Sequence, residues 1–433
     1  MGSVVRWGIF CCWFLLVGCG RGGAVPTPPT RLYPTAVPRT STPQVIQTNF
    51  VTPTPTVASP LSTPTPYWVT PMPPGQYGYP TLADFWAGGA EFVLEVVETG
   101  LPMGESDTVV MSNGELWSYL HASDRSARAI DQCGDPVEFP GCTVIYRSYD
   151  GGYTFVHDNP PVCQFACEAC PCEAERDHVT QQQYPRVMFD GEQILLVYEY
   201  LGRDTVRDSL DGLNWSKPER VAHSTIWQLW WRDCPEAERI GNHPFVPYFY
   251  ECLAGGPPGI YLDDAGRQYI FMAVGQNPGG MGCYWRWQGE SGGDFRACET
   301  HPLFVGAGNY GPLEEKGVGT NEYFDFRTIS AAEVQKVGEG AEARYYMLYE
   351  GIRGPGPGDP GDTQFGLGLA RSVTGEIDGV WEKYEANPIL VDLPGNIGLG
   401  HADLVVVAGQ TILYTSLDGA VRSRLRLVWK RGE

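Results

Sequence analysis

The chain has 433 residues and carries 51 Asp and Glu against 30 Lys and Arg, which gives a formal net charge of −21. A surface with this negative charge repels phosphate backbones and anionic headgroups. We therefore expect no nucleic-acid partner and no direct binding to anionic lipid. The 13 Trp and 23 Tyr fit two interpretations, namely aromatic faces that bind carbohydrate and the aromatic cores of β-sheets.

The first nineteen residues predict export. Arg6 is the only charged side chain before an apolar run over residues 7–17, which is too short to span a bilayer and has the length of a signal-peptide core. The run ends in the tetrapeptide LVGC, which resembles the bacterial lipobox and ends at Cys19. That resemblance implies a signal peptide over residues 1–18 and lipidation of Cys19, which would anchor the protein outside the cytoplasm on the cell membrane or outer membrane. A plain secretory signal and a retained membrane helix are the alternatives.

Residues 19–75 are predicted to form a linker. They are dominated by Pro, Thr, Ser and Val, and no acidic residue precedes Asp84. Proline at this density disfavours helix and sheet and favours an extended, semi-rigid chain. At roughly 3 Å per residue, about fifty such residues reach on the order of 150 Å. We therefore expect a tether that carries one large domain, residues 76–433, away from the membrane.

The domain contains an internal repeat. Five segments share an apolar strand, a tight polar turn and a second strand rich in Tyr and aliphatic residues, and they begin near residues 106, 185, 259, 332 and 402. Asn-Gly, Asp-Gly and Ala-Gly between apolar runs are hairpin signals. Repeats of this length, with strands enough for a four-stranded sheet each, predict an all-β fold, a five-bladed β-propeller.

Two further patterns agree with blades. The strand over residues 91–98 is left over, and we expect it to pair with the C-terminal strand in the last blade and so close the ring. The segments 148–155, 209–215 and 372–381 resemble Asp-box hairpins, in which an Asp accepts backbone N–H groups, a Gly takes a positive φ and an aromatic residue fills the space between sheets. These Asp residues are therefore predicted to be structural.

Ten cysteines follow the signal region, and an even number in an exported protein predicts five disulfides. Proximity in the sequence suggests three pairs, and the cluster that begins at Cys163 would form two more. The three pairs are Cys133–Cys142, Cys234–Cys252 and Cys283–Cys298. The cluster, Cys163, Cys167, Cys170 and Cys172, has a four-thiolate metal site as its alternative.

The five blades, the Asp-box hairpins and the run WEKYEANPIL over residues 381–390 together resemble the five-bladed glycoside hydrolases, which include family 43 arabinosidases and xylosidases and the fructosidases. The run GHADLVV over residues 400–406 resembles the start of their fifth blade, where the histidine lies by the central cavity. The resemblance implies a glycoside hydrolase that acts on an extracellular poly- or oligosaccharide, as a monomer. No cofactor is expected, except for Ca²⁺ or another ion near the propeller axis.

Glycoside hydrolysis normally needs two carboxyl groups. The resemblance implies acidic residues at the inner-strand starts of the first three blades, but only Asp107 fits, because Arg186 and Gly259 stand at the second and third positions. We therefore predict a site from other strand starts, with Asp107 as base or nucleophile, Glu333 as acid and Asp403 as a further catalytic carboxylate.

Three more residues complete the predicted site. His401 would support a water or an ion, while Arg186 and Arg327 would bind substrate. Each residue also has a structural interpretation: Asp107 as a hydrogen-bonding residue at the strand entry, Glu333 as a surface residue, His401 as a partner of backbone groups, and Arg186 as the neutraliser of an acidic ring.

Two other functions remain open at this stage. One is a non-catalytic propeller that binds a glycan, a protein or a cation, which the missing carboxylates in blades two and three favour. The other is a sialidase, which the Asp boxes favour and the number of blades disfavours.

Overall fold

The structure is a computed structural model. It describes residues 78–430 except for 103–104, 122–128, 131–135, 138–141, 164–182, 201–202, 225–238, 241–248, 251–253, 276–278, 307–323, 326–327, 354–363, 392–400 and 418–420. The predicted signal peptide, Cys19 and the linker up to residue 75 lie outside these residues. No helix among them is long and apolar enough to span a bilayer.

Within the described residues the strands form five main antiparallel sheets, and four of them are built from segments consecutive in the chain. The first contains β2 (Ser106–Val110), β3 (Leu116–His121), β6 (Cys142–Ser148) and β7 (Val156–Cys163). The second contains β8 (Gln183–Phe189), β9 (Ile194–Tyr200), β10 (Arg203–Ser209) and β11 (Glu219–Arg220). The third contains β14 (Ala254–Leu262), β15 (Arg267–Val274), β16 (Gly280–Trp287) and β17 (Arg296–Ala297).

The fourth sheet is extended by one short strand, and two small hairpins lie apart from the main sheets. The fourth contains β18 (Thr328–Val337), β19 (Arg344–Arg353), β20 (Gln364–Ser372), β21 (Trp381–Lys383) and β22 (Leu390–Val391). The hairpins are β4 (Ala129–Ile130) with β5 (Pro136–Val137), and β12 (Arg239–Ile240) with β13 (Phe249–Tyr250).

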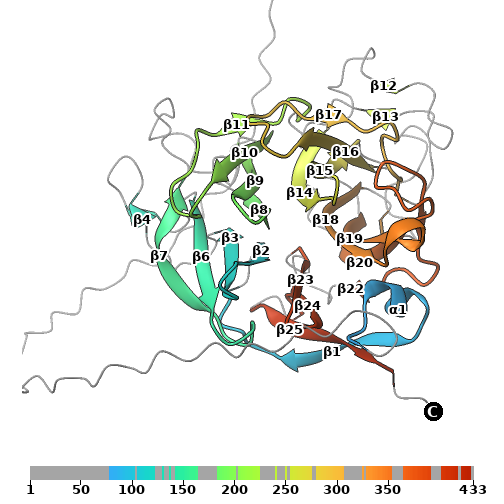
Figure 1. Ribbon diagram of the computed structural model, residues 1–433, viewed down its shortest axis with the longest axis horizontal. Helices are drawn as coiled ribbons and strands as arrows, with labels where there is room; N and C mark the ends of the chain where they lie inside the picture. Colours follow the sequence, from blue (N-terminus) through green and yellow to red (C-terminus); the bar gives the residue numbers. More distant parts are fainter. Residues whose placement is uncertain are drawn as a thin grey trace, which may run out of the picture. The chain divides into compact units, whose positions relative to one another are not determined.

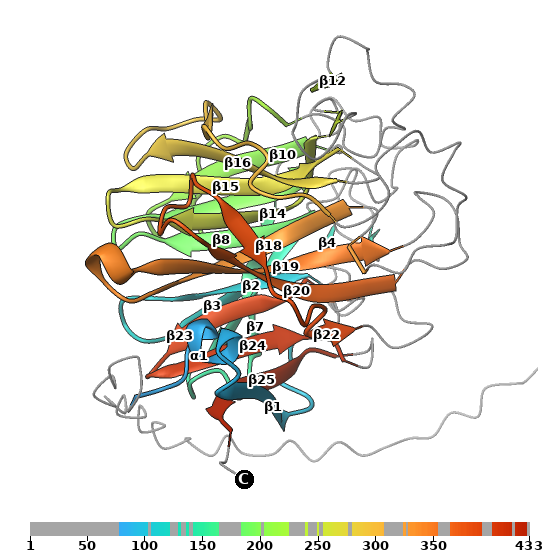
Figure 2. The ribbon, with the colours of Figure 1, turned by 90° about the vertical axis from the view of Figure 1, so that its right-hand side faces the viewer.

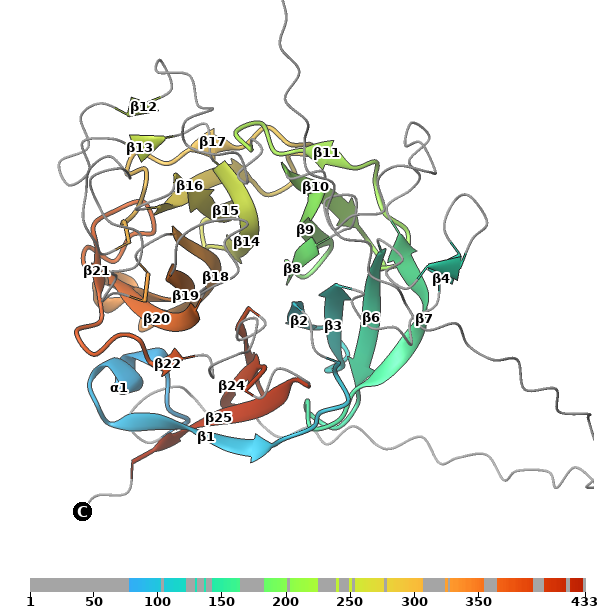
Figure 3. The same ribbon diagram turned by 180° about the vertical axis from the view of Figure 1, so that it is seen from behind.

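The fifth sheet joins the two ends of the described chain. It contains β23 (Asp403–Val407), β24 (Gln410–Thr415), β25 (Ser423–Trp429) and, as its outer strand, β1 (Ala90–Val96). Figure 3 shows β1 and β25 side by side at the rim. The register runs from Ala90 opposite Trp429 to Val96 opposite Arg424. The predicted closure of the ring by this early strand is confirmed.

The five sheets are blades arranged around one axis, with β2, β8, β14, β18 and β23 nearest the centre (Figure 1). Figure 2 shows the blades edge-on, with their strands stacked across the ring. The predicted five-bladed propeller is therefore confirmed. Short helix α1 (Leu82–Trp86) is pinned to the innermost strand of blade four, because Leu82 N donates to Gln335 Oε1 at 2.8 Å.

Hydrophobic side chains hold neighbouring blades together. In the described part of the chain the buried apolar residues fall into five clusters, and each cluster joins two adjacent blades. Leu196 and Tyr198 of blade two, for example, pack with Tyr119 and Ile145 of blade one, and all four are 0% exposed. The core of this fold is thus a ring of interfaces, and every blade depends on its two neighbours.

Two Asp-box hairpins show the predicted hydrogen bonds. Asp150 Oδ1 accepts the backbone N–H groups of Tyr153 and Thr154 at 3.0 Å each, and Asp211 Oδ1 accepts those of Leu213 and Asn214 at 2.8 and 2.7 Å. The aromatic plugs behave as expected too. Phe155, Trp215 and Trp381 pack in the clusters between blades. The predicted structural role of these turns is confirmed.

One predicted disulfide lies within the described side chains. Cys283 and Cys298 are bonded, with their Cα atoms 5.4 Å apart, so this pair is confirmed. The remaining predicted pairs and the alternative four-thiolate site involve side chains outside the described set and stay predictions.

The interblade clusters generate a stability prediction. We expect Leu196→Ala to lower the free energy of unfolding by about 2–5 kcal/mol, because Leu196 is fully buried between blades one and two. Leu210→Ala is the matched control, since that side chain is 81% exposed and its loss should change stability by about 0.5 kcal/mol or less. Urea unfolding followed by tryptophan fluorescence measures both, and equal effects of the two changes would contradict this account of the core.

Candidate functional site

Four predicted site residues meet at the propeller axis. Asp107 comes from β2, Arg186 from β8, Glu333 from β18 and Asp403 from β23, and their exposed fractions are 4%, 2%, 9% and 0%. The structure thus brings together one inner-strand side chain from each of four blades. The alternative interpretation of Glu333 as a surface residue is wrong, because its side chain lies at this buried centre.

Blade three contributes backbone in place of a side chain. A Cβ atom on Gly259 would lie 2.4 Å from the carbonyl oxygen of Ala332 on the inner strand of blade four. Only glycine permits this approach of the two strands. The neighbouring Pro258 presents its carbonyl oxygen to the axis, where it accepts a hydrogen bond from Arg186 Nε at 3.0 Å.

The Arg186 guanidinium occupies the centre of the ring. Besides Pro258 O on blade three, it donates through Nη1 to Ser106 O on blade one at 3.3 Å and through Nη2 to Ala402 O beside blade five at 3.4 Å. Its planar fork therefore satisfies backbone carbonyls from three other blades at once.

The same guanidinium pairs with two carboxylates. Arg186 Nη1 lies 2.7 Å from Glu333 Oε1 on blade four and 3.7 Å from Asp107 Oδ1 on blade one. Blades one, three, four and five therefore all contact Arg186 of blade two. These are the contacts expected of an arginine that neutralises an acidic ring, whereas its predicted role in substrate binding stays a prediction.

The two axial aspartates also link neighbouring blades. Asp107 Oδ2 accepts the backbone N–H of Val187 on blade two at 2.6 Å. Asp403 does the same one blade earlier, since its Oδ1 accepts the N–H of Thr108 at 3.1 Å and its Oδ2 accepts the Thr108 hydroxyl at 2.7 Å. Each aspartate thus fixes the inner strand of the following blade.

Burial dominates the electrostatics of the cluster. It raises the pKa of Asp107 to about 7, although Arg186 acts in the opposite direction. Burial and the nearby charge of Asp107 raise the pKa of Glu333 well above its usual range, and burial also raises the pKa of Asp403. Burial lowers the pKa of Arg422, which lies beside Asp403, to about 10.

The arginine at the centre stays charged. Burial alone would lower the pKa of Arg186, but the carboxylates of Glu333, Asp107 and Asp403 outweigh burial and raise it. With Arg422, the described axial side chains comprise two guanidiniums and three carboxyl groups. A hydrogen bond joins Glu333 to Asp107, and both carboxyl groups lie in the field of the Arg186 cation.

Three blades carry the same backbone irregularity next to this cluster. Tyr184, Ala331 and His401 have φ of 53°, 53° and 50°, and each lies two positions before the axial residue of its blade. The ladders of β8 and β18 shift register across Tyr184 and Ala331, as in a β-bulge. Left-handed conformations of non-glycine residues are strained, and such strain gathers at functional sites.

Two of these left-handed residues, Tyr184 and His401, bring their rings together at the strand-entry end of the axis. The rings of Tyr184 and His401 lie edge to face with centroids 5.0 Å apart. His401 Nδ1 pairs with the buried carboxylate of Glu350, and its Nε2 lies 3.8 Å from Glu105 Oε1. Burial, followed by the charges of nearby glutamates, raises the pKa of Tyr184 well above its usual value.

Sequence reasoning predicted His401 as a site residue but missed two of its contacts, Tyr184 and Glu350. Tyr184 carried one signal, its position directly before the Pro-Arg pair at a strand start. Glu350 carried none, because it lies inside a second strand and reaches His401 only through the folded ring. Arg327 lies outside the described residues.

The described residues contain no group of three or more His, Cys, Asp or Glu side chains arranged to hold a metal ion. The ion that the resemblance implies near the axis stays a prediction.

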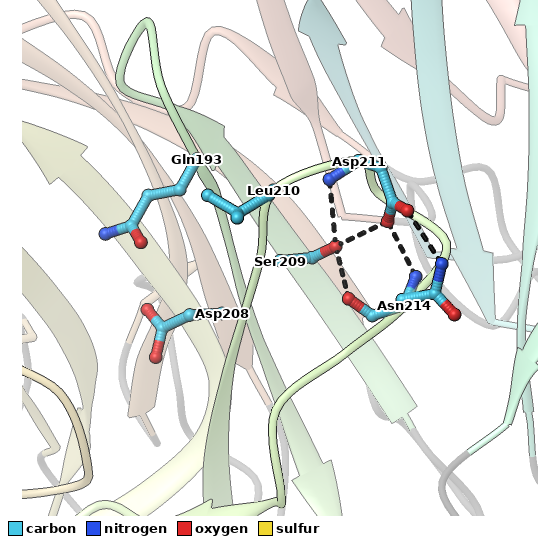
Figure 4. Close-up of a pocket in the computed structure, with 6 residues that line it drawn as sticks. All are labelled: Gln193, Asp208, Ser209, Leu210, Asp211 and Asn214. Carbon is cyan, nitrogen blue, oxygen red and sulfur yellow. Dashed lines mark hydrogen bonds between the residues drawn. The ribbon is translucent and has the colours of Figure 1, made fainter.

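A pocket of about 300 Å³ lies away from the axis, at the Asp-box hairpin of blade two. Figure 4 shows its lining, in which Ser209, Asp211 and Asn214 hydrogen-bond to one another while Gln193 and Asp208 point away from them. The Asp211 carboxylate is occupied by its own turn, which lowers its pKa. The polar groups of this pocket are therefore used in the hydrogen bonds of the turn, and the pocket lacks an acid paired with a base.

Neither a family model nor a curated protein matches the sequence. Similar solved structures include the family 43 glycoside hydrolase BlXynB from Bacillus licheniformis, at 13% identity over 75% of this chain and a TM-score of 0.46. The chain spans only 50% of BlXynB. An endo-arabinase from Bacteroides thetaiotaomicron is 13% identical over 78% of this chain and 98% of its own, with a TM-score of 0.45.

A third similar structure is a putative glycoside hydrolase from Parabacteroides distasonis, at 14% identity over 85% of this chain and 96% of its own, with a TM-score of 0.43. At these identities the likeness concerns the fold alone. Family 43 enzymes, which the sequence resembles, are thus among the chain's structural neighbours.

Removal of the central cation should destabilise the ring. We expect Arg186→Met to lower the free energy of unfolding by about 3–5 kcal/mol, because it leaves buried carboxylates without their counter-ion. Arg296→Met is the matched control, since Arg296 pairs with Glu290 on the surface, where solvent screens the pair and its loss should change stability little. Denaturant unfolding compares the two, and an Arg186 variant as stable as the control would show that the cation does not hold the ring.

The axial acids also predict a pH dependence. The Asp107 proton leaves near pH 3.8 in the unfolded chain and near pH 7 in the folded one, so the folded state loses stability as the pH rises between these values. We expect Asp107→Asn to flatten this decline, which is on the order of a few kcal/mol. Urea unfolding between pH 4.5 and 7.5 measures it, with the exposed Glu192→Gln as control. Equal slopes in wild type and the Asn variant would refute the assignment.

Proposed function

We propose that the protein is a carbohydrate-binding propeller whose ligand site is the strand-entry end of the axis. The observation that carries this proposal is the pair of strained residues there, Tyr184 and His401, whose rings meet edge to face. Aromatic and polar side chains converging on one point suit a sugar, which has apolar ring faces and hydroxyl groups. The resemblance to the five-bladed glycoside hydrolases supports the same ligand class.

The state of the axial acids supports binding without hydrolysis. In a glycosidase the two carboxyl groups stand about 5–9.5 Å apart with the scissile bond between them. Here Asp107 and Glu333 share one Arg186 nitrogen, hydrogen-bond to each other and are buried. Both groups link the blades, and the two lie too close together for a sugar to fit between them.

Glycoside hydrolysis is the second candidate, favoured by one observation. Burial raises the pKa of Glu333 well above its usual range and that of Asp107 to about 7, and two carboxyl groups of unequal pKa are what general acid–base catalysis uses. In this mechanism the substrate would have to part the two carboxyl groups. Glu333 would then protonate the leaving oxygen, with Asp107 as base or nucleophile and Asp403 holding the first blade.

We further propose that the propeller acts outside the cell as a monomer. Lipidation of Cys19 would anchor it, and the linker up to residue 75 would hold it at a distance from the membrane. A polymer outside the cell can reach such a site, which agrees with an extracellular glycan as partner.

The test compares binding and turnover on one panel of neutral polysaccharides, namely arabinan, xylan, mannan and fructan. We expect affinity electrophoresis to detect retention by at least one of them, reduced tenfold or more in Tyr184→Ala. Tyr149→Ala is the matched control, because Tyr149 is 61% exposed in a hairpin at the opposite ends of the strands. Unchanged retention in Tyr184→Ala, or no retention by any glycan, would refute the binding proposal.

Turnover decides between the two candidates. Release of reducing sugar should stay at background for wild type with every polysaccharide in the panel. Release that disappears in Asp107→Asn, while the variant remains folded, would establish the hydrolase instead.

A further inference from the structure

The disulfide in blade three has a defined place in the sheet. Cys283 lies in β16, the third strand, and Cys298 directly follows β17, the fourth. Tyr284 and Ala297 are ladder partners, so the two cysteines occupy the next rung, where Cys298 N donates to Cys283 O at 2.9 Å. The bond therefore joins facing positions on the third and fourth strands of one blade.

Blade one repeats this arrangement. Cys142 is the first residue of β6, the third strand, and Cys163 is the last residue of β7, the fourth. The register pairs Cys142 directly with Cys163, and the next rung pairs Thr143 with Val162. Two cysteines thus face each other between the same two strands as in blade three.

We propose that Cys142 and Cys163 form a second blade-internal disulfide. Facing residues in an antiparallel pair have Cα atoms about 4.5 or 5.5 Å apart, within the range of about 4.4–6.8 Å that disulfides adopt. The bond forms when the two thiols together lose two electrons and two protons to an exchangeable disulfide, which oxidised glutathione supplies in a refolding mixture.

This bond changes the pairing expected from sequence proximity. Cys142 is no longer available to Cys133, and Cys163 leaves the cluster that would otherwise hold two disulfides or a metal. Six cysteines remain, an even number that permits three further bonds: Cys133, Cys167, Cys170, Cys172, Cys234 and Cys252. A four-thiolate site that uses Cys163 is excluded by the same bond.

The position of the bond relates it to the axis. Cys163 ends blade one, and the chain then runs through residues 164–182 to β8, which carries Tyr184 and Arg186. A disulfide at Cys163 fixes the start of that connection to the third strand of blade one. The inference does not depend on the proposed function.

Peptide mapping of the full chain, exported from a bacterial host, tests the proposal. Free thiols are blocked with N-ethylmaleimide before digestion without reductant. Combined cleavage after Glu138, Arg147, Phe165 and Glu168 places Cys133, Cys142, Cys163 and Cys167 on separate peptides. We expect mass spectrometry to find Cys142 linked to Cys163, in the same digest as the linked pair Cys283–Cys298. Cys142 linked to any other cysteine, or alkylated as a free thiol, would overturn the proposal.

A variant gives an independent measurement. Cys142→Ser should add one maleimide-reactive thiol per molecule in the denatured protein, located at Cys163. Cys283→Ser is the matched control, with its new thiol at Cys298. A new thiol at Cys133 in the Cys142 variant would instead support the pairing by proximity and refute the facing pair.

Discussion

The Arg186 guanidinium is the constraint on which the ring depends. From blade two it reaches the inner strands of the other four blades, through three carbonyl oxygens and two carboxylates. Only the arginine side chain can do this, because its planar fork spreads five N–H donors over several directions, whereas lysine offers three from one atom. Because the site is buried, each contact is strong, and a polar group left without its partner would destabilise the fold.

The same residue separates this propeller from the arrangement that its resemblance implies. A carboxylate on blade two would leave the axis acidic and open to a substrate or an ion, whereas the cation draws Asp107 and Glu333 into a closed cluster. The axial acids then fix the geometry of the ring, which is why the function proposed above places the ligand at Tyr184 and His401. A change of sign at one position thus distinguishes this axis from the one that the resemblance implies.

Sequence reasoning reached the fold because the repeat is local. Hairpin turns, Asp boxes and the spacing of the segments predict the blades, and the leftover strand predicts β1, since an unpaired edge would be unfavourable. The site is not local. Asp107, Arg186 and Glu333 were identified one by one as axial, but their mutual pairing depends on all five blades being closed, and no pattern around Glu350 indicates its contact with His401. The left-handed backbone of Tyr184 and His401 has no signal in residue type, because neither is a glycine.

That absence of glycine is itself informative. The inner strand of blade three makes its register shift with Gly255 and Gly256, which take positive φ at little cost. Blades two and five place Tyr184 and His401 in the left-handed region instead, at about 1–2 kcal/mol each. If the irregularity served only to bend the strand, glycine would do so with less strain. Ala331 of blade four takes the same conformation with only a methyl side chain, so the strain alone assigns no role. What sets Tyr184 and His401 apart is their placement at the strand-entry end of the axis, where they meet each other and Glu350.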